Sequence, residues 1–227
     1  MTDDARSFLA GVRSELPLLI GVLPFGLIYG ASALASGLPP AAAQAMSAVV
    51  FAGAAQFIAA QLLHGGAPAT VVILTIAVVN LRHVLYSASV APYLERLPLR
   101  WRSWLAYLLT DEAYAVTIVH YETNGMTPTG HWFFLGAGVS LWTTWQLSTA
   151  LGIFLGTTVP AAWPLDFAVP LTFIALVMPT LIDRPAAMAA LSAGVISMLA
   201  RALPYQSGLM LAALAGIGVG MILEPAK

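Results

Sequence analysis

The sequence predicts an all-α fold, a polytopic bundle of transmembrane helices. Hydrophobic residues make up 59% of its 227 positions and charged residues only 8%, and the mean hydropathy is +0.86. A soluble domain is about a quarter charged, so a chain this poor in charge needs the lipid bilayer as its solvent. The apolar runs do not alternate with period two, as the strands of a membrane β-barrel would. They are therefore predicted to be helices.

About seven to eight membrane segments fit this length, because a spanning helix takes about 20 apolar residues. Glycine, proline and charged residues separate the segments, and all of them belong to a single membrane domain, 1–227. Within the bundle the fifth segment is longer than a straight span needs, and we expect it to tilt or to break near Gly152. A polar N-terminal segment, 1–15, precedes the bundle, 16–223, whose segments are 16–34, 41–63, 70–90, 104–121, 132–159, 167–182, 186–203 and 208–223.

The second segment, 41–63, is expected to be a broken or re-entrant helix. Arginines cluster near the N-terminus and in the loop 92–102, which favours a cytoplasmic position for both. Both positions hold only if an even number of crossings separates them, yet three apolar segments lie between. Segment 41–63 has Gly53 and Gln56 at its middle and is the candidate that does not cross. The alternative is an N-terminus outside the cell, since acidic residues offset its arginines.

A charged residue first interrupts the apolar sequence in VVNLRHVLYS, residues 78–87. From position 16 to position 81 the chain carries no Asp, Glu, Lys or Arg. On a helix, Asn80 and His83 share one face, while Arg82 and Tyr86 share the adjoining face. A charged group at mid-membrane costs about 2.5–3.5 kcal/mol on insertion scales, so this cluster is a candidate site.

A second polar cluster, Thr110, Asp111 and Glu112, lies within AYLLTDEAYAVTIV. We expect the helices on either side of the loop 92–102 to be antiparallel neighbours. Arg82 lies about ten residues before that loop and Asp111 about nine residues after it. At about 1.5 Å per residue both reach a similar depth, which predicts a contact between Arg82 and a carboxylate.

Two interpretations of these clusters stay open. An Arg82–carboxylate contact could be a structural ion pair that locks two helices, or part of a transport site that faces a wet cavity. Two acids and one arginine leave one acid free to bind a substrate ammonium group or a proton. His83 could carry a proton or serve as a hydrogen-bonded packing residue, and Gln56 could bind a ligand or a neighbouring helix.

Other functional classes find little support in the sequence. It lacks the HExxH, GxSxG and P-loop motifs, so we expect no enzyme, although an intramembrane enzyme is a weaker alternative. The net charge of −1 argues against a nucleic-acid partner. The chain contains no cysteine, which removes disulfides and thiolate metal sites. We expect no cofactor and no bound metal.

At its polar clusters the sequence resembles the AzlC-type branched-chain amino acid exporters. The resemblance is carried by VNLRHVLYS at 79–87 and LTDEAYAV at 109–116, with PFGLIYG and FAGAAQF upstream, and runs from about Leu16 to Met221. It implies a multi-pass permease of the bacterial inner membrane that exports leucine, isoleucine and valine. It also implies a small AzlD-type membrane subunit as partner.

The resemblance suggests roles for the clustered residues. A branched-chain amino acid needs a cation or a helix N-terminus for its carboxylate, an anion for its ammonium group and an apolar pocket. Arg82 would serve the first role and Asp111 or Glu112 the second, with Phe51, Phe57 and Val84 as pocket walls. Proton-coupled export would titrate Glu112, Asp111 or His83, and Asn80, Tyr86, Thr110 and Gln56 complete the candidate site. The alternative function is a non-conducting scaffold subunit that completes a partner's pathway.

Overall fold

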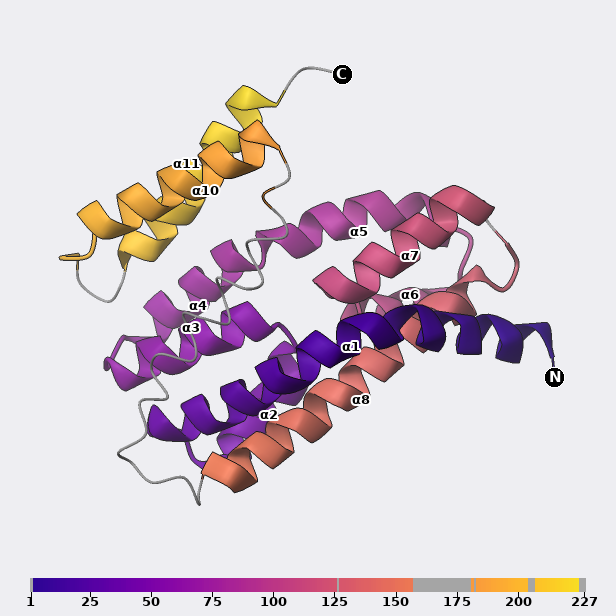
Figure 1. Ribbon diagram of the computed structural model, residues 1–227, viewed down its shortest axis with the longest axis horizontal. Helices are drawn as coiled ribbons and strands as arrows, with labels where there is room; N and C mark the ends of the chain where they lie inside the picture. The colour runs from indigo at the N-terminus through magenta and orange to yellow at the C-terminus, as the bar shows by residue number, and fades with distance from the viewer. Residues whose placement is uncertain (1, 126, 157–180, 182, 204–206, 225–227) are drawn as a thin grey trace.

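The structure, a computed structural model shown in Figure 1, confirms the all-α fold. It describes residues 2–125, 127–156, 181, 183–203 and 207–224. Predicted segment 167–182 lies outside the described residues, apart from Leu181. The described residues form helices and no strand: α1 (Asp3–Ala35), α2 (Pro40–Val50), α3 (Gly53–His64), α4 (Ala69–Val79), α5 (Leu81–Leu94), α6 (Leu99–Tyr107), α7 (Asp111–Asn124), α8 (Gly130–Gly156), α10 (Arg184–Leu199) and α11 (Ser207–Leu223).

The N-terminal segment, expected to be a polar stretch ahead of the bundle, is the first part of helix α1. The helix begins at Asp3, and the side chain of Thr2 caps it by accepting from the backbone N–H of Ala5. The acidic residues Asp3 and Asp4 lie in its first turn, where they interact favourably with the helix dipole. The whole polar segment therefore continues directly into the apolar helix.

Helices α1 and α8 pack against each other along most of their length and run parallel (Figure 1). Gly11 lies against Phe133 near the start of both helices, and Gly30 lies against Thr149 near their ends. A Cβ atom on most of these glycines would collide with backbone atoms of the other helix, so glycine is what allows the close approach. We call these residues the glycine seam: Gly11, Gly26, Gly30, Gly136, Gly152 and Gly156.

The seam corrects the expectation of a break near Gly152. Helix α8 continues unbroken to Gly156. Gly152 is required instead because a Cβ atom at this position would collide with the backbone oxygen of Leu27 in α1.

Helices α2 and α3 form a re-entrant hairpin, as the sequence predicted for segment 41–63. The α2 helix starts four residues after Ser36, and α3 ends at His64, whose ring nitrogen Nδ1 lies 3.1 Å from the carbonyl oxygen of Ser36. The hairpin therefore enters and leaves at the same end of the molecule (Figure 1). Its tip, Phe51 and Ala52, lies in the middle of the molecule.

Helices α4 and α5 together cross the molecule, with an interruption at Asn80. They start at the end where α3 finishes and reach the end that carries the N-terminus (Figure 1). Two crossings, α1 and α4–α5, thus separate the N-terminus from the loop after Leu94. This is the even number that the arginine distribution requires.

Segment 104–121 was expected to be one span, and the structure shows a second re-entrant hairpin instead. Near the start of α6, the Trp101 ring lies 5.0 Å from that of Trp132, and at the end of α7 the Tyr121 hydroxyl donates to the carbonyl of Gly130. Both outer ends of this hairpin therefore lie beside the start of α8. Its tip is the stretch 108–110.

This hairpin corrects the predicted antiparallel packing. Helix α7 runs parallel to α5, because Tyr86 stacks on Tyr114 at 4.5 Å and Tyr93 stacks on Tyr121 at 4.9 Å. The short helix α6 reverses the chain between them.

The predicted number of spans is not confirmed. Within the described residues, three helices are long and apolar enough to cross a membrane: Asp3–Ala35, Ala69–Leu94 and Arg184–Ala202. The helix α8 has 27 residues, or about 40 Å at 1.5 Å per residue, but is not among these three helices. Helices α10 and α11 pack against each other beside α4 (Figure 1), and α10 has no buried residue.

Candidate functional site

The tips of the two re-entrant hairpins meet in the middle of the molecule beside a cavity of about 450 Å³. Tyr107 connects them, because its hydroxyl donates to the carbonyl of Ala48 at 2.6 Å and its ring lies 5.9 Å from that of Phe51. The volume is typical of small-molecule sites, which span about 300–1,000 Å³. The cavity is lined by Val22, Phe25, Phe51, Ala52, Gly53, Ala54, Arg82, Tyr86, Thr110, Asp111, Glu112, Leu141 and Trp145.

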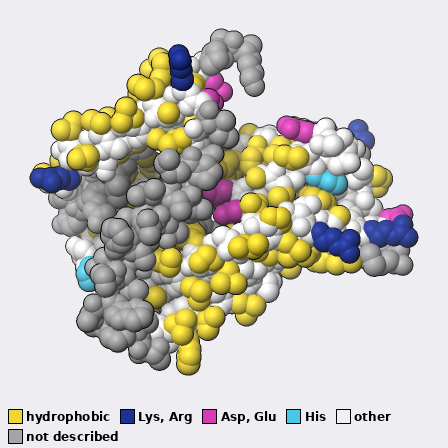
Figure 2. All heavy atoms as spheres, in the orientation of Figure 1, with side chains coloured by type: hydrophobic (Ala, Val, Ile, Leu, Met, Phe, Trp, Pro, Cys, Tyr) yellow, Lys and Arg dark blue, Asp and Glu magenta, His cyan; other side chains and the backbone are white. Residues whose placement is uncertain are grey.

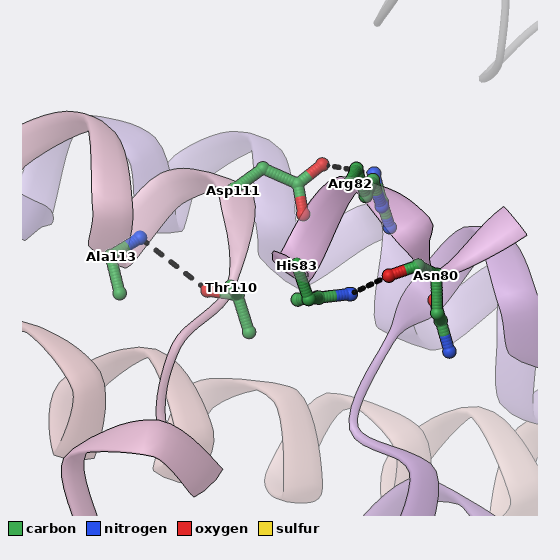
Figure 3. Close-up of polar contacts among 6 residues, drawn as sticks. All are labelled: Asn80, Arg82, His83, Thr110, Asp111 and Ala113. Carbon is green, nitrogen blue, oxygen red and sulfur yellow. Dashed lines mark hydrogen bonds and ion pairs between the residues drawn. The ribbon is translucent and has the colours of Figure 1, made fainter. Parts of the chain in front are cut away.

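An ion pair between Arg82 and Asp111 lies on the cavity wall (Figure 3). A contact between Arg82 and a carboxylate, Asp111 or Glu112, was predicted, although from the wrong helix direction. The two side chains keep 27% and 43% of their exposure, so the pair is open rather than sealed inside the protein. Figure 2 likewise shows acidic side chains at the centre of a largely hydrophobic face.

The start of α7 supplies both acids of the cavity. Thr110 caps the helix, since its side-chain oxygen accepts from the N–H of Ala113 at 3.4 Å (Figure 3). Asp111 and Glu112 follow in the first turn, where the helix dipole stabilises negative charge. Among the described residues Arg82 forms its ion pair with Asp111, which leaves Glu112 as the second acid on the wall.

The start of α3 faces the same cavity without any acid. Its N-cap residue is Ala52, which has no side chain that can accept from the first N–H groups of the helix. Ala52, Gly53 and Ala54 line the cavity. Such a helix start is a ready site for an anion.

The backbone at the tip before α3 is unusual. Phe51 has φ 42° and ψ 46°, a left-handed conformation that bulky side chains seldom adopt. Among the described residues it is the one non-glycine residue with positive φ. Conformations of this kind persist where the surroundings determine them, often at functional sites.

Aromatic and aliphatic side chains from α1 and α8 form the apolar wall. The Phe25 ring lies 5.7 Å from Trp145, which donates its ring N–H to Gln56. The sequence did not single out Val22, Phe25, Leu141 or Trp145, because nothing in an apolar helix marks the residues that border a cavity.

Three of the predicted site residues, Asn80, His83 and Gln56, do not line this cavity. His83 turns toward Asn80, with Nδ1 3.3 Å from the Asn80 carbonyl oxygen (Figure 3). Gln56 is fully buried, and its side-chain oxygen accepts from the N–H of Ala52 and from Trp145, both at 3.2 Å. The structure therefore places Gln56 as a support for the α2–α3 tip.

The predicted pocket walls are partly corrected. Phe51 lines the cavity as expected. Phe57 instead lies behind the wall, with its ring 5.0 Å from Phe25. Val84 is 62% exposed and lies away from the cavity.

Comparison with known proteins identifies relatives of this chain. The family model described as "AzlC protein" matches residues 17–159. The inner membrane protein YgaZ of Escherichia coli is 27% identical over 180 residues, which is 77% of this chain and 73% of the relative. An uncharacterized membrane protein of Archaeoglobus fulgidus is 30% identical over 92% of both chains. No solved structure matches the chain.

Proposed function

Because the chain belongs to the AzlC protein family, we propose that it is a secondary transporter subunit that exports branched-chain amino acids across the bacterial inner membrane. The observation that carries this proposal is the mid-molecule cavity, where an ion pair, a second acid and an uncapped helix start face an apolar wall. Ionisable groups at membrane depth are costly, and they commonly mark substrate or ion pathways.

The charges of the cavity match those of an amino acid backbone. The substrate carboxylate binds between Arg82 and the N–H groups at the start of α3. The ammonium group binds Asp111 and Glu112. Entry of the zwitterion opens the Arg82–Asp111 pair and gives Arg82 a new anionic partner and Asp111 a new cationic partner, so neither charge is left unpaired.

The apolar wall selects the side chain of the substrate. Val22, Phe25, Leu141 and Trp145 offer no charged group to a side chain that reaches them. Burying an aliphatic side chain there contributes about 25 cal/mol per Å² of apolar surface. A charged side chain would lose its hydration without a partner, so aliphatic amino acids are favoured.

Orientation, coupling and partner complete the proposal. The N-terminus and the loop after Leu94 lie at one end, together with Arg6, Arg96, Arg100 and Arg102, and Figure 2 shows basic side chains gathered there. We assign this end to the cytoplasm by the positive-inside rule. Export is coupled to protons, and a small AzlD-type membrane subunit joins the chain in the working exporter.

A charge-reversal experiment tests whether the ion pair binds substrate or only holds two helices together. The variants are Arg82→Asp, Asp111→Arg and the double exchange, each reconstituted in vesicles with and without the small partner. Flux of radiolabelled leucine is compared with the flux of glutamate and of lysine, whose side chains are charged. We expect all three variants to lose leucine flux at least tenfold, because the exchanged pair presents each charge to the wrong end of the substrate.

Arg100→Gln is the matched control, because Arg100 is an exposed arginine at the N-terminal end of α6. It should keep the flux of the unmodified protein. Recovery of flux in the double exchange would overturn the substrate-binding role and assign the pair to structure. If reconstituted protein with its partner carries leucine while the Arg82 and Asp111 variants are as active as wild type, this chain is the scaffold and the pathway lies in the partner.

A further inference from the structure

One acid of the molecule has no role in the cavity described above. Glu15 lies in α1 and is fully buried, with 0% of its surface exposed. Neither of its carboxylate oxygens has a hydrogen-bond partner among the described residues. The sequence alone did not single it out, since it stands one residue before the first apolar segment and resembles an ordinary interfacial charge.

Glu15 lies close to the charged tip of the α6–α7 hairpin. Gly11 of α1 packs against Ala137, and the next residue of α8, Gly138, packs against Leu108 at that tip. Glu15 is one helical turn beyond Gly11, which brings it to the level of the tip. Glu112 follows this tip, in the first turn of α7.

No described cation neutralises Glu15. Of the helices that pack against α1, α2 has no ionisable side chain and α3 has only His64, which is bound to Ser36 at the far end. Helix α8 contributes His131 in its first turn. Helix α7 contributes Glu112 together with Asp111, Tyr114, His120, Tyr121 and Glu122, and Arg82 of α5 is paired with Asp111.

The free energy of burial therefore favours a neutral Glu15. An isolated carboxylate in a low-dielectric interior is far more costly than a carboxylic acid, and such groups bind a proton instead. A negative neighbour such as Glu112 increases the preference for the neutral form.

We propose that Glu15 is a proton-binding site of the transport cycle, separate from the substrate cavity and linked to it through Glu112. The use of this proton in transport rests on the proposed transport function, whereas the presence of the proton on Glu15 does not. In the conformation described here Glu15 holds one proton on a carboxyl oxygen. Release of that proton to water places a second negative charge beside Glu112, which strengthens the binding of a substrate ammonium group.

Infrared difference spectroscopy of the purified full-length protein in lipid tests the proton without any transport. The C=O stretching band of a buried carboxylic acid should be present at neutral pH. It should disappear in Glu15→Gln and persist in Glu122→Gln, which removes an exposed carboxyl near the end of α7. A band unchanged in Glu15→Gln would overturn the proposal, whatever the protein transports.

Vesicle flux tests how the proton is used. In the reconstituted exporter, leucine flux is compared with and without an imposed pH gradient. Glu15→Gln resembles the protonated acid in shape and charge, so we expect leucine exchange to continue while the ratio of the two fluxes falls to unity. Glu15→Asp should restore part of the stimulation by the gradient.

The outcomes separate the two proposals. If Glu15→Gln loses the infrared band and keeps gradient-driven flux, Glu15 holds a proton that transport does not use, and the coupling role is overturned. If the unmodified protein carries no leucine while the band behaves as expected, the proposed substrate is wrong but the proton-binding site stands.

Discussion

The two re-entrant hairpins each consist of two helices joined at a tip, and they contribute different chemistry. The α2–α3 hairpin reaches the cavity with Phe51, Ala52 and Gly53, which carry no ionisable side chain, whereas the α6–α7 hairpin reaches it with Asp111 and Glu112. Both present the start of a helix to the cavity. One start is capped by Thr110 and followed by acids, and the other is uncapped. The pair thus offers an anion-binding end and a cation-binding end across a single cavity, which suits a zwitterion.

The largest expected effect comes from making the uncapped tip resemble the charged one. In Ala54→Asp the new carboxylate lies in the first turn of α3 and occupies the N–H groups that the substrate carboxylate would use. We expect leucine binding and flux to fall at least tenfold. Thermal stability should stay equal or rise, because an acid at a helix start stabilises it by about 0.3–1 kcal/mol.

Ala54→Asn is the isosteric neutral control for this change. It should retain clearly more binding than Ala54→Asp, measured by isothermal titration in detergent. Equal binding in the two variants and the wild type would show that the start of α3 does not hold the substrate.

A smaller effect is expected from a methyl group added at the uncapped tip. In Gly53→Ala the Cβ atom would lie 2.8 Å from Phe25 Cε1 and 3.1 Å from Trp145 Cη2. Displacing two packed rings should destabilise the protein by about 1–3 kcal/mol, seen as a lower unfolding midpoint in detergent.

The matched control is Gly21→Ala in α1, where a Cβ atom meets nothing within 4 Å. Alanine is the better helix former by about 1 kcal/mol, so this variant should be as stable as the wild type or more stable. A similar loss in both variants would show that the tip packing is not responsible.

The smallest effect is expected at the cap of the charged tip. Thr110→Val removes the oxygen that accepts from Ala113 N–H and should cost about 1 kcal/mol. Thr110→Ser keeps the oxygen and should recover most of that stability in the same unfolding measurement. Failure of serine to recover it would assign the loss to the methyl group of Thr110 instead.

Much of the arrangement could be predicted from the sequence, but not all of it for the right reason. The non-crossing segment 41–63 followed from the positions of the arginines. A contact between Arg82 and a carboxylate followed from distances to the loop 92–102, on the wrong premise of antiparallel helices. The second hairpin was missed because no glycine or proline interrupts the apolar run before Thr110. The order threonine, aspartate, glutamate at 110–112 is itself a helix-start signal, and it was available to indicate the break.

Other features depend on contacts between distant parts of the chain. The burial of Glu15 arises because α1 continues as a helix through the polar N-terminal residues and packs on α8. The sequence left open whether Gln56 binds a ligand or packs against a neighbouring helix. Its orientation depends on the hydrogen bond from Trp145, which lies 89 positions away in the chain. Periodicity within one helix carries no information about such partners.

The glycine seam limits which parts of the molecule can move in the proposed transport. At Gly11, Gly30, Gly136 and Gly152 the backbones of α1 and α8 touch so closely that a slide of one turn, about 5.4 Å, would force bulkier residues into contact. We therefore expect the two helices to keep a constant separation during the proposed transport. We expect any movement during the proposed transport to lie in the hairpins, because both outer ends of each hairpin lie at one end of the molecule.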